Sequence, residues 1–197
     1  MLTTRISLLA LALFSAGQVM ADSQADSKGF VEDSHLNLAL RNAYINRDYK
    51  NGSEDKAEWG QAFMANFASG FTQGTVGVGV DAFGLYGVRL DGGKGRSGAG
   101  GIDFFKQGDS GAAADDLSRV GAAVKARISN TVIKYGDQMP ALPVLSYDNS
   151  RLLPESFTGT MITSKEIDGL EVVAGRFTQQ ARKSAEGRDS GDLKSID

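Results

Sequence analysis

Residue types that often carry catalytic or metal chemistry are scarce in this chain. Cysteine is absent from the 197 residues, and His35 is the single histidine. Without cysteine there is no disulfide framework, thiol nucleophile or Cys-based zinc site. A Ser-His-Asp triad would depend on His35 alone, which stands at the start of an expected strand on its polar face. We therefore expect no enzyme activity, no cofactor and no bound metal.

Positive charge and long apolar runs are also limited. The 21 basic and 24 acidic side chains give a formal net charge of -3. Affinity for nucleic acid depends on clustered positive charge, so we expect no nucleic-acid partner. After residue 21, no segment approaches the roughly 18 continuous apolar residues that predict a membrane-spanning helix. A membrane β-barrel remains possible, because only alternate side chains of its strands meet lipid.

Residues 1–21 have the three parts of a secretory signal peptide. Arg5 is the single charge ahead of an apolar stretch at 6–14, and small residues lead up to Ala21. The apolar stretch is shorter than the roughly 20 residues of a spanning helix. We predict cleavage after Ala21 and export of the remaining residues, 22–197.

The exported part is rich in glycine and alternates between apolar and polar residues. In 119–129, Arg119, Lys125 and Arg127 share one parity, whereas valine, alanine and isoleucine occupy the other. A helical period of about 3.6 residues would scatter these charges among the apolar positions, so the pattern predicts strands. About seven strands are expected, the clearest at 35–47, 75–90 and 119–129 and the less regular at 57–71, 131–139, 160–167 and 170–178.

The connections between these strands differ in length. Short turns are expected at 72–74, 130–131 and 168–169, and long loops at 91–116 and 140–159. Short turns on one rim and long loops on the other are typical of an outer-membrane barrel. A soluble β-sandwich is the alternative, since its apolar face would fill a core. Two features favour the barrel. The polar positions of the strands are rich in glycine, which leaves room in a lumen. Aromatic residues also stand near strand ends, where an interfacial girdle would lie: Tyr44, Trp59, Phe71 and Tyr86.

Seven segments carry a resemblance to a known family. They are GFVEDS at 29–34, LRN at 40–42, NRD at 46–48, SGFTQGTVG at 69–77, GVDA at 79–82, SRLLP at 150–154 and EIDGL at 166–170. From about residue 29 to its end, the chain resembles the OprD family of outer-membrane porins. The resemblance implies an all-β fold, an 18-stranded transmembrane antiparallel β-barrel, within the range of about 16–18 strands typical of porins.

The resemblance also implies a location and a function. We expect a channel in the outer membrane of a Gram-negative bacterium, through which small carboxylate-bearing solutes diffuse. These solutes are either aromatic and other monocarboxylates or basic amino acids and peptides. The expected partners are these solutes, outer-membrane lipid, lipopolysaccharide and the barrel-assembly machinery.

Seven strands are too few to close such a barrel. An open edge in hydrocarbon leaves backbone N–H and C=O groups unpaired, at a cost of several kcal/mol each. We therefore interpret residues 22–197 as the N-terminal part of a porin barrel, including a constriction loop near 140–159. A non-conducting truncated remnant and, less favoured, an outer-membrane barrel enzyme are the alternatives.

The resemblance points to particular basic residues. In the family, a ladder of basic side chains conducts the carboxylates of substrates through the constriction. By their positions in matching motifs, Arg47, Lys56 and Arg151 fall on this ladder. An arginine offers a carboxylate two parallel hydrogen bonds, whereas a lysine such as Lys56 acts as a point charge. Four further basic residues have the parity of the lumen and are expected to be pore-wall charges: Arg41, Arg89, Lys125 and Arg127.

Two other patterns are interpreted as ordinary loop sequence. The glycine pattern GxGxxG at 93–98 is not followed by a helix whose N-terminus would bind a pyrophosphate. Four acidic residues lack the regular spacing of a calcium loop and are expected to keep the loop soluble: Asp103, Asp109, Asp115 and Asp116. We expect the long loops to lie outside the cell or to fold inward, and 72–74 and 168–169 to face the periplasm.

Overall fold

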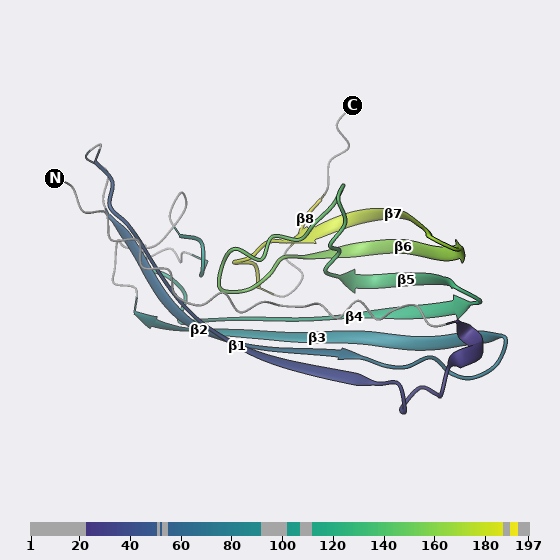
Figure 1. The fold of residues 1–197 in the computed structure, drawn as a ribbon. Helices are drawn as coiled ribbons and strands as arrows, with labels where there is room; N and C mark the ends of the chain where they lie inside the picture. Colours follow the sequence, from purple (N-terminus) through teal and green to yellow (C-terminus); the bar gives the residue numbers. More distant parts are fainter. Residues whose placement is uncertain are drawn as a thin grey trace.

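Eight antiparallel strands form one sheet and follow one another in chain order (Figure 1). This computed structural model describes residues 23–50, 52, 55–91, 102–106, 112–186 and 190–192, so the expected signal peptide and the glycine pattern at 93–98 lie outside it. A 3-10 helix, η1 (Gln24–Asp26), precedes β1 (His35–Arg47), β2 (Lys56–Ala68), β3 (Val76–Asp91), β4 (Asp116–Ile128), β5 (Thr131–Gln138), β6 (Ser156–Ile167), β7 (Leu170–Ala181) and β8 (Ser190–Asp192). Within the described ranges, no helix has the length and apolar character needed to cross a membrane.

All seven expected strands are present, and several of their bounds differ from the prediction: β4 begins at Asp116 instead of 119, and β7 ends at Ala181 instead of 178. The short β8 was not expected, and β6 begins at Ser156 instead of 160. The expected strand at 57–71 ends at Ala68. Beyond that point the main-chain N–H of Gly70 donates to the carbonyl of Phe30 at 2.9 Å, so the chain bonds the N-terminal segment there. The turn between β4 and β5 is made by Ser129 and Asn130, and Ser129 has a φ of 51°.

The expected difference between the two rims is confirmed. The connections at 69–75, 129–130 and 168–169 lie at one end of the antiparallel strands, and those at 48–55, 92–115 and 139–155 lie at the other. Gly169 has a φ of 75°, a backbone conformation that L side chains rarely adopt. Glu166 joins two neighbouring turns, because its carboxylate accepts from the main-chain N–H of Asn130 at 2.9 Å.

One face of the sheet is apolar and exposed. Large apolar side chains project from it on every long strand, and examples are Leu36, Leu38, Leu40, Val78, Val120, Val124, Ile133, Tyr135, Ile162 and Val172, which are 41–73% exposed. Within the described part of the chain there is a single sheet, so no second sheet covers this face. The soluble-sandwich alternative is therefore wrong, and a continuous apolar face of this kind requires an apolar environment.

Three of the four aromatic residues expected in a girdle lie on this outer face. Tyr44, Trp59 and Tyr86 are 60%, 40% and 43% exposed. The expectation for Phe71 is wrong, because it is buried on the opposite side. The charged groups of Lys125 and Arg127 lie 4.9 Å and 4.2 Å from the centre of its ring. Phe71 follows the end of β2, where the chain no longer keeps the alternation of the strand.

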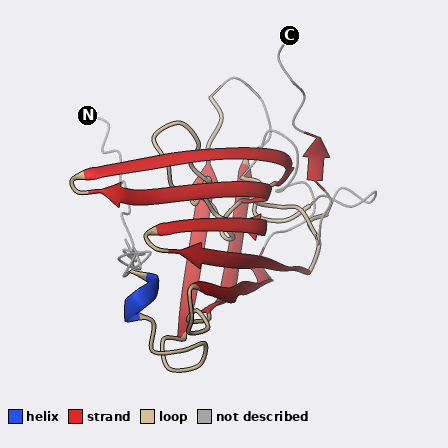
Figure 2. Ribbon diagram, turned by 90° about the vertical axis from the view of Figure 1, so that its right-hand side faces the viewer, coloured by secondary structure: helices blue, strands red, loops and turns tan. Residues whose placement is uncertain are grey.

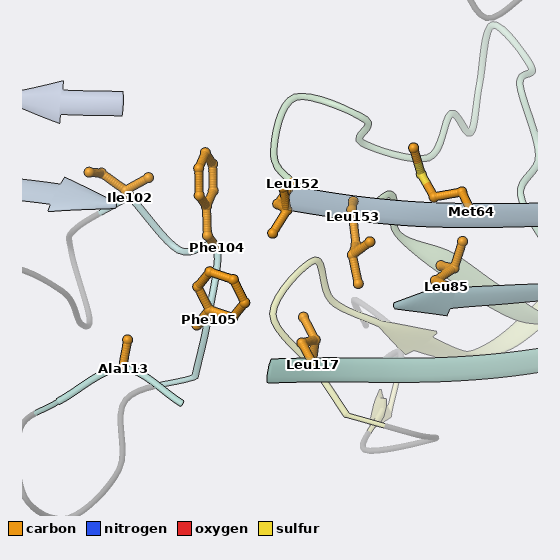
Figure 3. Close-up of a cluster of buried hydrophobic side chains, with 10 residues drawn as sticks. Met64, Leu85, Ile102, Phe104, Phe105, Ala113, Leu117, Leu152 and Leu153 are labelled. Carbon is orange, nitrogen blue, oxygen red and sulfur yellow. The ribbon is translucent and has the colours of Figure 1, made fainter. Parts of the chain in front are cut away.

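Loops cover the inner face, and this face carries apolar as well as polar side chains. The sheet curls, and the long connections lie on the side toward which it curls (Figure 2). Ile102, Phe104 and Phe105 of one loop and Leu152 and Leu153 of another meet strand side chains in a buried apolar cluster (Figure 3). The strands contribute Ala62, Met64, Leu85 and Leu117 to it. Both long loops are thus packed on the sheet by hydrophobic contact.

The two faces predict opposite responses to an added charge on neighbouring residues of β1. Leu38 lies on the outer face and is 70% exposed, whereas Asn37 lies on the inner face. In lipid vesicles, Leu38→Arg should lower the free energy of unfolding by about 2–4 kcal/mol near the bilayer midplane and by less toward its edge. Asn37→Arg, the matched control, should change it little. Equal losses in the two variants would contradict the assignment of the faces.

Candidate functional site

The loop at 139–155 is bonded to the inner face by an arginine of β1. Arg41 donates from Nη1 to the carbonyls of Arg151 at 2.5 Å and Leu152 at 3.3 Å. Its Nη2 donates to Oδ1 of Asn149 at 2.8 Å. Arg41 has the inward parity that the sequence predicted, and these contacts direct its guanidinium at the backbone of the loop.

A second arginine holds the same loop from β4. Arg119 donates to the carbonyl of Pro154 and, at 2.6 Å, to that of Arg182, just after β7. Its side chain is only 2% exposed. A charge buried to this extent is stable only when polar groups replace its water, and here main-chain carbonyls do so. The segment from 149 to 154 is therefore bonded at one end to β1 and at the other to β4.

Between these two arginines, the loop fits into space left by glycines. Leu152 and Leu153 are fully buried. A Cβ on Gly60 of β2 would come within 2.6 Å of Leu152 Cδ2, and one on Gly87 of β3 within 3.1 Å of the same atom. The absent side chains at 60 and 87 thus form the recess that Leu152 fills.

A buried acid holds the other long loop. Glu58 of β2 is fully buried, and its Oε2 accepts from the main-chain N–H of Phe104 at 2.7 Å. Its other oxygen, Oε1, has no hydrogen-bond partner within the described residues. Glu58 lies on the same face as Lys56, two residues earlier in the strand. Electrostatic attraction from Arg151 also acts on Glu58, so Arg151 lies near this end of β2.

The segment after β7 ties the two loops together. Lys183 forms an ion pair with Asp148, and the hydroxyl of Ser184 donates to Oδ1 of Asp103 at 2.7 Å. Burial acts to raise the pKa of Asp148, but the hydrogen bonds from Lys183 and Ser150 outweigh it and lower the pKa to about 2. Asp148 is therefore charged at neutral pH, and the ion pair to Lys183 stays formed.

Two of the three residues predicted for the basic ladder are neighbours at one end of the inner face, and the third, Arg151, lies in the loop bonded to Arg41. Arg47 and Lys56 stand directly opposite each other where β1 and β2 are joined. Arg47 shares the parity, and so the face, of Arg41. Arg151 is half-buried in the loop, and its Nη1 donates to the carbonyl of Ser150 at 3.1 Å.

The remaining predicted wall charges have side-chain partners. Arg89 forms an ion pair with Asp115 beside the first long loop. At the opposite rim, Lys125 pairs with Asp81 at 2.6 Å, and Arg127 Nε donates to Oε1 of Gln24 at 2.9 Å. Of the four acids discussed from the sequence, Asp103 and Asp115 are engaged in these contacts, Asp116 begins β4, and Asp109 lies outside the described residues.

A cavity of about 700 Å³ lies on the inner face beside the loop. Phe83 and Leu85 of β3 form part of an apolar wall, and its charged lining is Lys134, Asp81 and Asp137, with Lys134 paired to Asp81. Tyr147 and Asn149 line it from the loop. The loop therefore separates this space from the end of the sheet where Arg47 and Lys56 lie.

Sequence reasoning missed Glu58 and Arg119 as functional residues. Arg119 has the parity of Lys125 and Arg127, which was a usable signal, although nothing local shows that it is buried. Arg41 and its partner Arg151 are separated by 110 residues in sequence, and Glu58 and Phe104 by 46. Contacts over such distances follow from how the loops fold back, which alternation within a strand does not reveal.

Comparisons with known proteins agree with this arrangement. Residues 28–196 match the family described as outer membrane porin, OprD family. Porin D of Pseudomonas aeruginosa is 47% identical over 166 residues, which are 84% of this chain and 37% of that protein. The solved structure of Acinetobacter baumannii OccAB1 is 40% identical with a TM-score of 0.79, and covers 85% of this chain and 40% of its own. The structure of Pseudomonas aeruginosa OpdK with vanillate is 42% identical with a TM-score of 0.75, over 84% of this chain and 41% of its own.

The curved antiparallel sheet, its apolar outer face and its inward loops define a transmembrane β-barrel of the porin class. Porins are transporters and not enzymes. The chain belongs to the OprD family of outer-membrane porins, which confirms the resemblance carried by its motifs. Its location is the outer membrane of a Gram-negative bacterium. It spans 37–41% of the length of the three relatives named above.

The glycine recess under Leu152 generates a stability prediction. Gly60→Val places new atoms where Leu152 already lies, so it should lower the free energy of unfolding by about 1–3 kcal/mol, as overpacking does. Gly84 of β3 has no atom within 4 Å of an added Cβ. Gly84→Val, the matched control, should stay within about 0.5 kcal/mol of the parent. Urea unfolding in detergent measures both, and a similar loss in both variants would show that the recess is unimportant.

Proposed function

We propose that the protein forms a passive channel for small carboxylate-bearing solutes, with Arg47, Lys56 and Arg151 as its basic ladder. The observation that carries this proposal is the inward-packed loop that contains Arg151, together with the pairing of Arg47 and Lys56 on the same face of β1 and β2. Several cations along one wall would stabilise a solute anion as it loses its hydration in a narrow passage.

The physical reason lies in the cost of dehydration. A carboxylate entering a narrow, low-dielectric passage loses hydration, and fixed donors must replace the lost hydrogen bonds. Arginines can donate two parallel hydrogen bonds to one carboxylate, and several cations in sequence let the anion move without a deep energy minimum. Lys56 provides charge without the planar geometry of a guanidinium, so we assign it a weaker role than Arg47 or Arg151.

The solute class is supported by one relative and by the cavity. OpdK, 42% identical to this chain, has been solved with vanillate, which is an aromatic carboxylate. The cavity beside the loop adds an apolar lining suited to the apolar body of such a solute. Its charges, Lys134, Asp81 and Asp137, do not favour an anion, because Lys134 is paired with Asp81. We therefore favour aromatic and other monocarboxylates over basic amino acids and peptides.

The other wall charges are assigned a supporting role. Arg41, Arg89, Lys125 and Arg127 are bonded to loops, acids or the N-terminal segment. We propose that they contribute positive potential along the wall while the ladder residues contact the solute.

The proposal extends to export and assembly. Residues 1–21 are proposed to direct export, 22–197 to form the N-terminal part of the barrel, and the barrel-assembly machinery to insert it among lipid and lipopolysaccharide. The second candidate, a non-conducting remnant, is motivated by β1, which pairs only with β2 in the described residues. Heat-modifiable migration on a gel separates the two, because a closed barrel shifts on boiling and a remnant does not.

Arg151→Ala, in the protein expressed from its whole gene, tests the ladder. Carboxylate entry should fall relative to entry of a neutral sugar of similar size, because a desolvated anion loses a partner worth roughly 1.5–3 kcal/mol. Arg151→Glu should reduce it further, since like charges repel. Liposome swelling measures the two rates. Lys50→Ala, which removes an exposed loop charge paired with Asp48, is the control and should leave the ratio of rates unchanged.

Two other results would count against this assignment. An equal change in the carboxylate and sugar rates would mean that Arg151 shapes the opening without recognising charge. Unchanged rates would make Arg151 an ordinary surface charge.

A further inference from the structure

We propose that Arg41 and Arg119 are positioning residues: they hold the loop at 149–154 against the inner face and thereby fix Arg151, without touching the solute themselves. This inference rests on the proposed function, because it concerns the placement of a ladder residue. It gives both arginines a role in positioning the loop that sequence parity alone does not predict.

The bonding of Arg119 is unusual for a buried cation. Its hydrogen-bond partners among the described residues are two main-chain carbonyls, and its Nε has none there. A buried charge is normally paired with an opposite charge, and breaking such an arrangement is costly. The acid that acts electrostatically on Arg119 is Glu155, which belongs to the same loop. The loop therefore supplies one of the two carbonyls and the acid that stabilise Arg119, and Arg119 in turn supplies a donor to the loop.

The bonding of Arg41 gives direct control over Arg151. Arg41 donates to the carbonyl of Arg151 itself, at 2.5 Å. Both terminal nitrogens of Arg41 donate to the loop, one to carbonyls and one to the side chain of Asn149. A solute carboxylate at Arg41 would have to displace these bonds, so the guanidinium is already committed to the loop.

The three attachments act on one short segment. Arg41 fixes residues 149–152, Leu152 fills the recess between Gly60 and Gly87, and Arg119 fixes Pro154. The segment thus crosses from β1 to β4 with a polar contact at each end and an apolar contact between them. If one polar contact is lost, the carbonyls are still buried but lack donors, and the segment must shift to reach water. Arg151 shifts with it.

Transport measurements on Arg41→Met and Arg119→Met test this inference in the protein expressed from its whole gene. Each should lower the carboxylate-to-sugar ratio by about threefold or more, as expected for residues that act through a neighbour. In the Arg151→Ala background, neither should lower the ratio further. Arg41→Lys keeps the positive charge but loses the planar guanidinium, so its carboxylate-to-sugar ratio should lie between those of Arg41→Met and the parent. Lys125→Met removes an inner-face cation that does not contact this loop, and should change the ratio less than either arginine variant.

A second readout is independent of transport. Ser150→Cys provides an attachment point for a spin label between the two anchors, with any cysteine outside residues 1–197 of the whole-gene protein first replaced. Label mobility should rise in Arg41→Met and Arg119→Met but not in Lys125→Met, with heat-modifiable migration confirming that each variant is folded. Unchanged mobility would overturn the inference, as would additive losses of selectivity in the Arg151→Ala background. A parent protein that passes no solute would overturn the proposed function instead, while the label would still test the anchoring.

Discussion

The structure depends on the period-two alternation of its strands. Every long strand places large apolar side chains on the outer face, whereas the inner face combines small, charged and buried apolar side chains, so one sheet serves two environments. Because lipid contacts the apolar outer face and cannot solvate the polar backbone of a loop, the long loops pack on the inner face. Their main-chain polar groups then need donors and acceptors there, and Arg41, Arg119 and Glu58 supply them.

Glycine makes this inner face able to receive a loop. Gly60 and Gly87 leave the recess for Leu152, and Gly70 lies so close to the N-terminal segment that an added Cβ would come within 2.1 Å of the Gly29 carbonyl. Two motifs that are far apart in sequence, at 29–34 and 69–77, therefore meet at the rim with the short turns. The glycines at inward-facing strand positions, which helped to indicate a barrel from the sequence, also allow backbone segments to approach each other closely.

The fold was largely predictable from the sequence, and the site only in part. Alternation located the strands and their faces, because it is set by local backbone geometry. It failed for Phe71, which lies beyond the strand end and packs beneath Lys125 and Arg127. The roles of Arg41 and Arg119 were not predictable, because both depend on where a loop from a distant part of the chain folds. The motif containing Arg151 marked the loop, but its attachment to the sheet is a tertiary property.

The central claim is that the loop carrying Arg151 lies in the path of the solute. The most direct measurement is single-channel current through the Ser150→Cys variant of the whole-gene protein during reaction with an anionic thiol reagent. Residues 1–197 contain no cysteine, and the parent protein treated with the same reagent is the control. We expect a stepwise fall in current as the thiol reacts, and slower reaction when a small aromatic carboxylate is present. Complete labelling with no change in current would place the loop outside the passage.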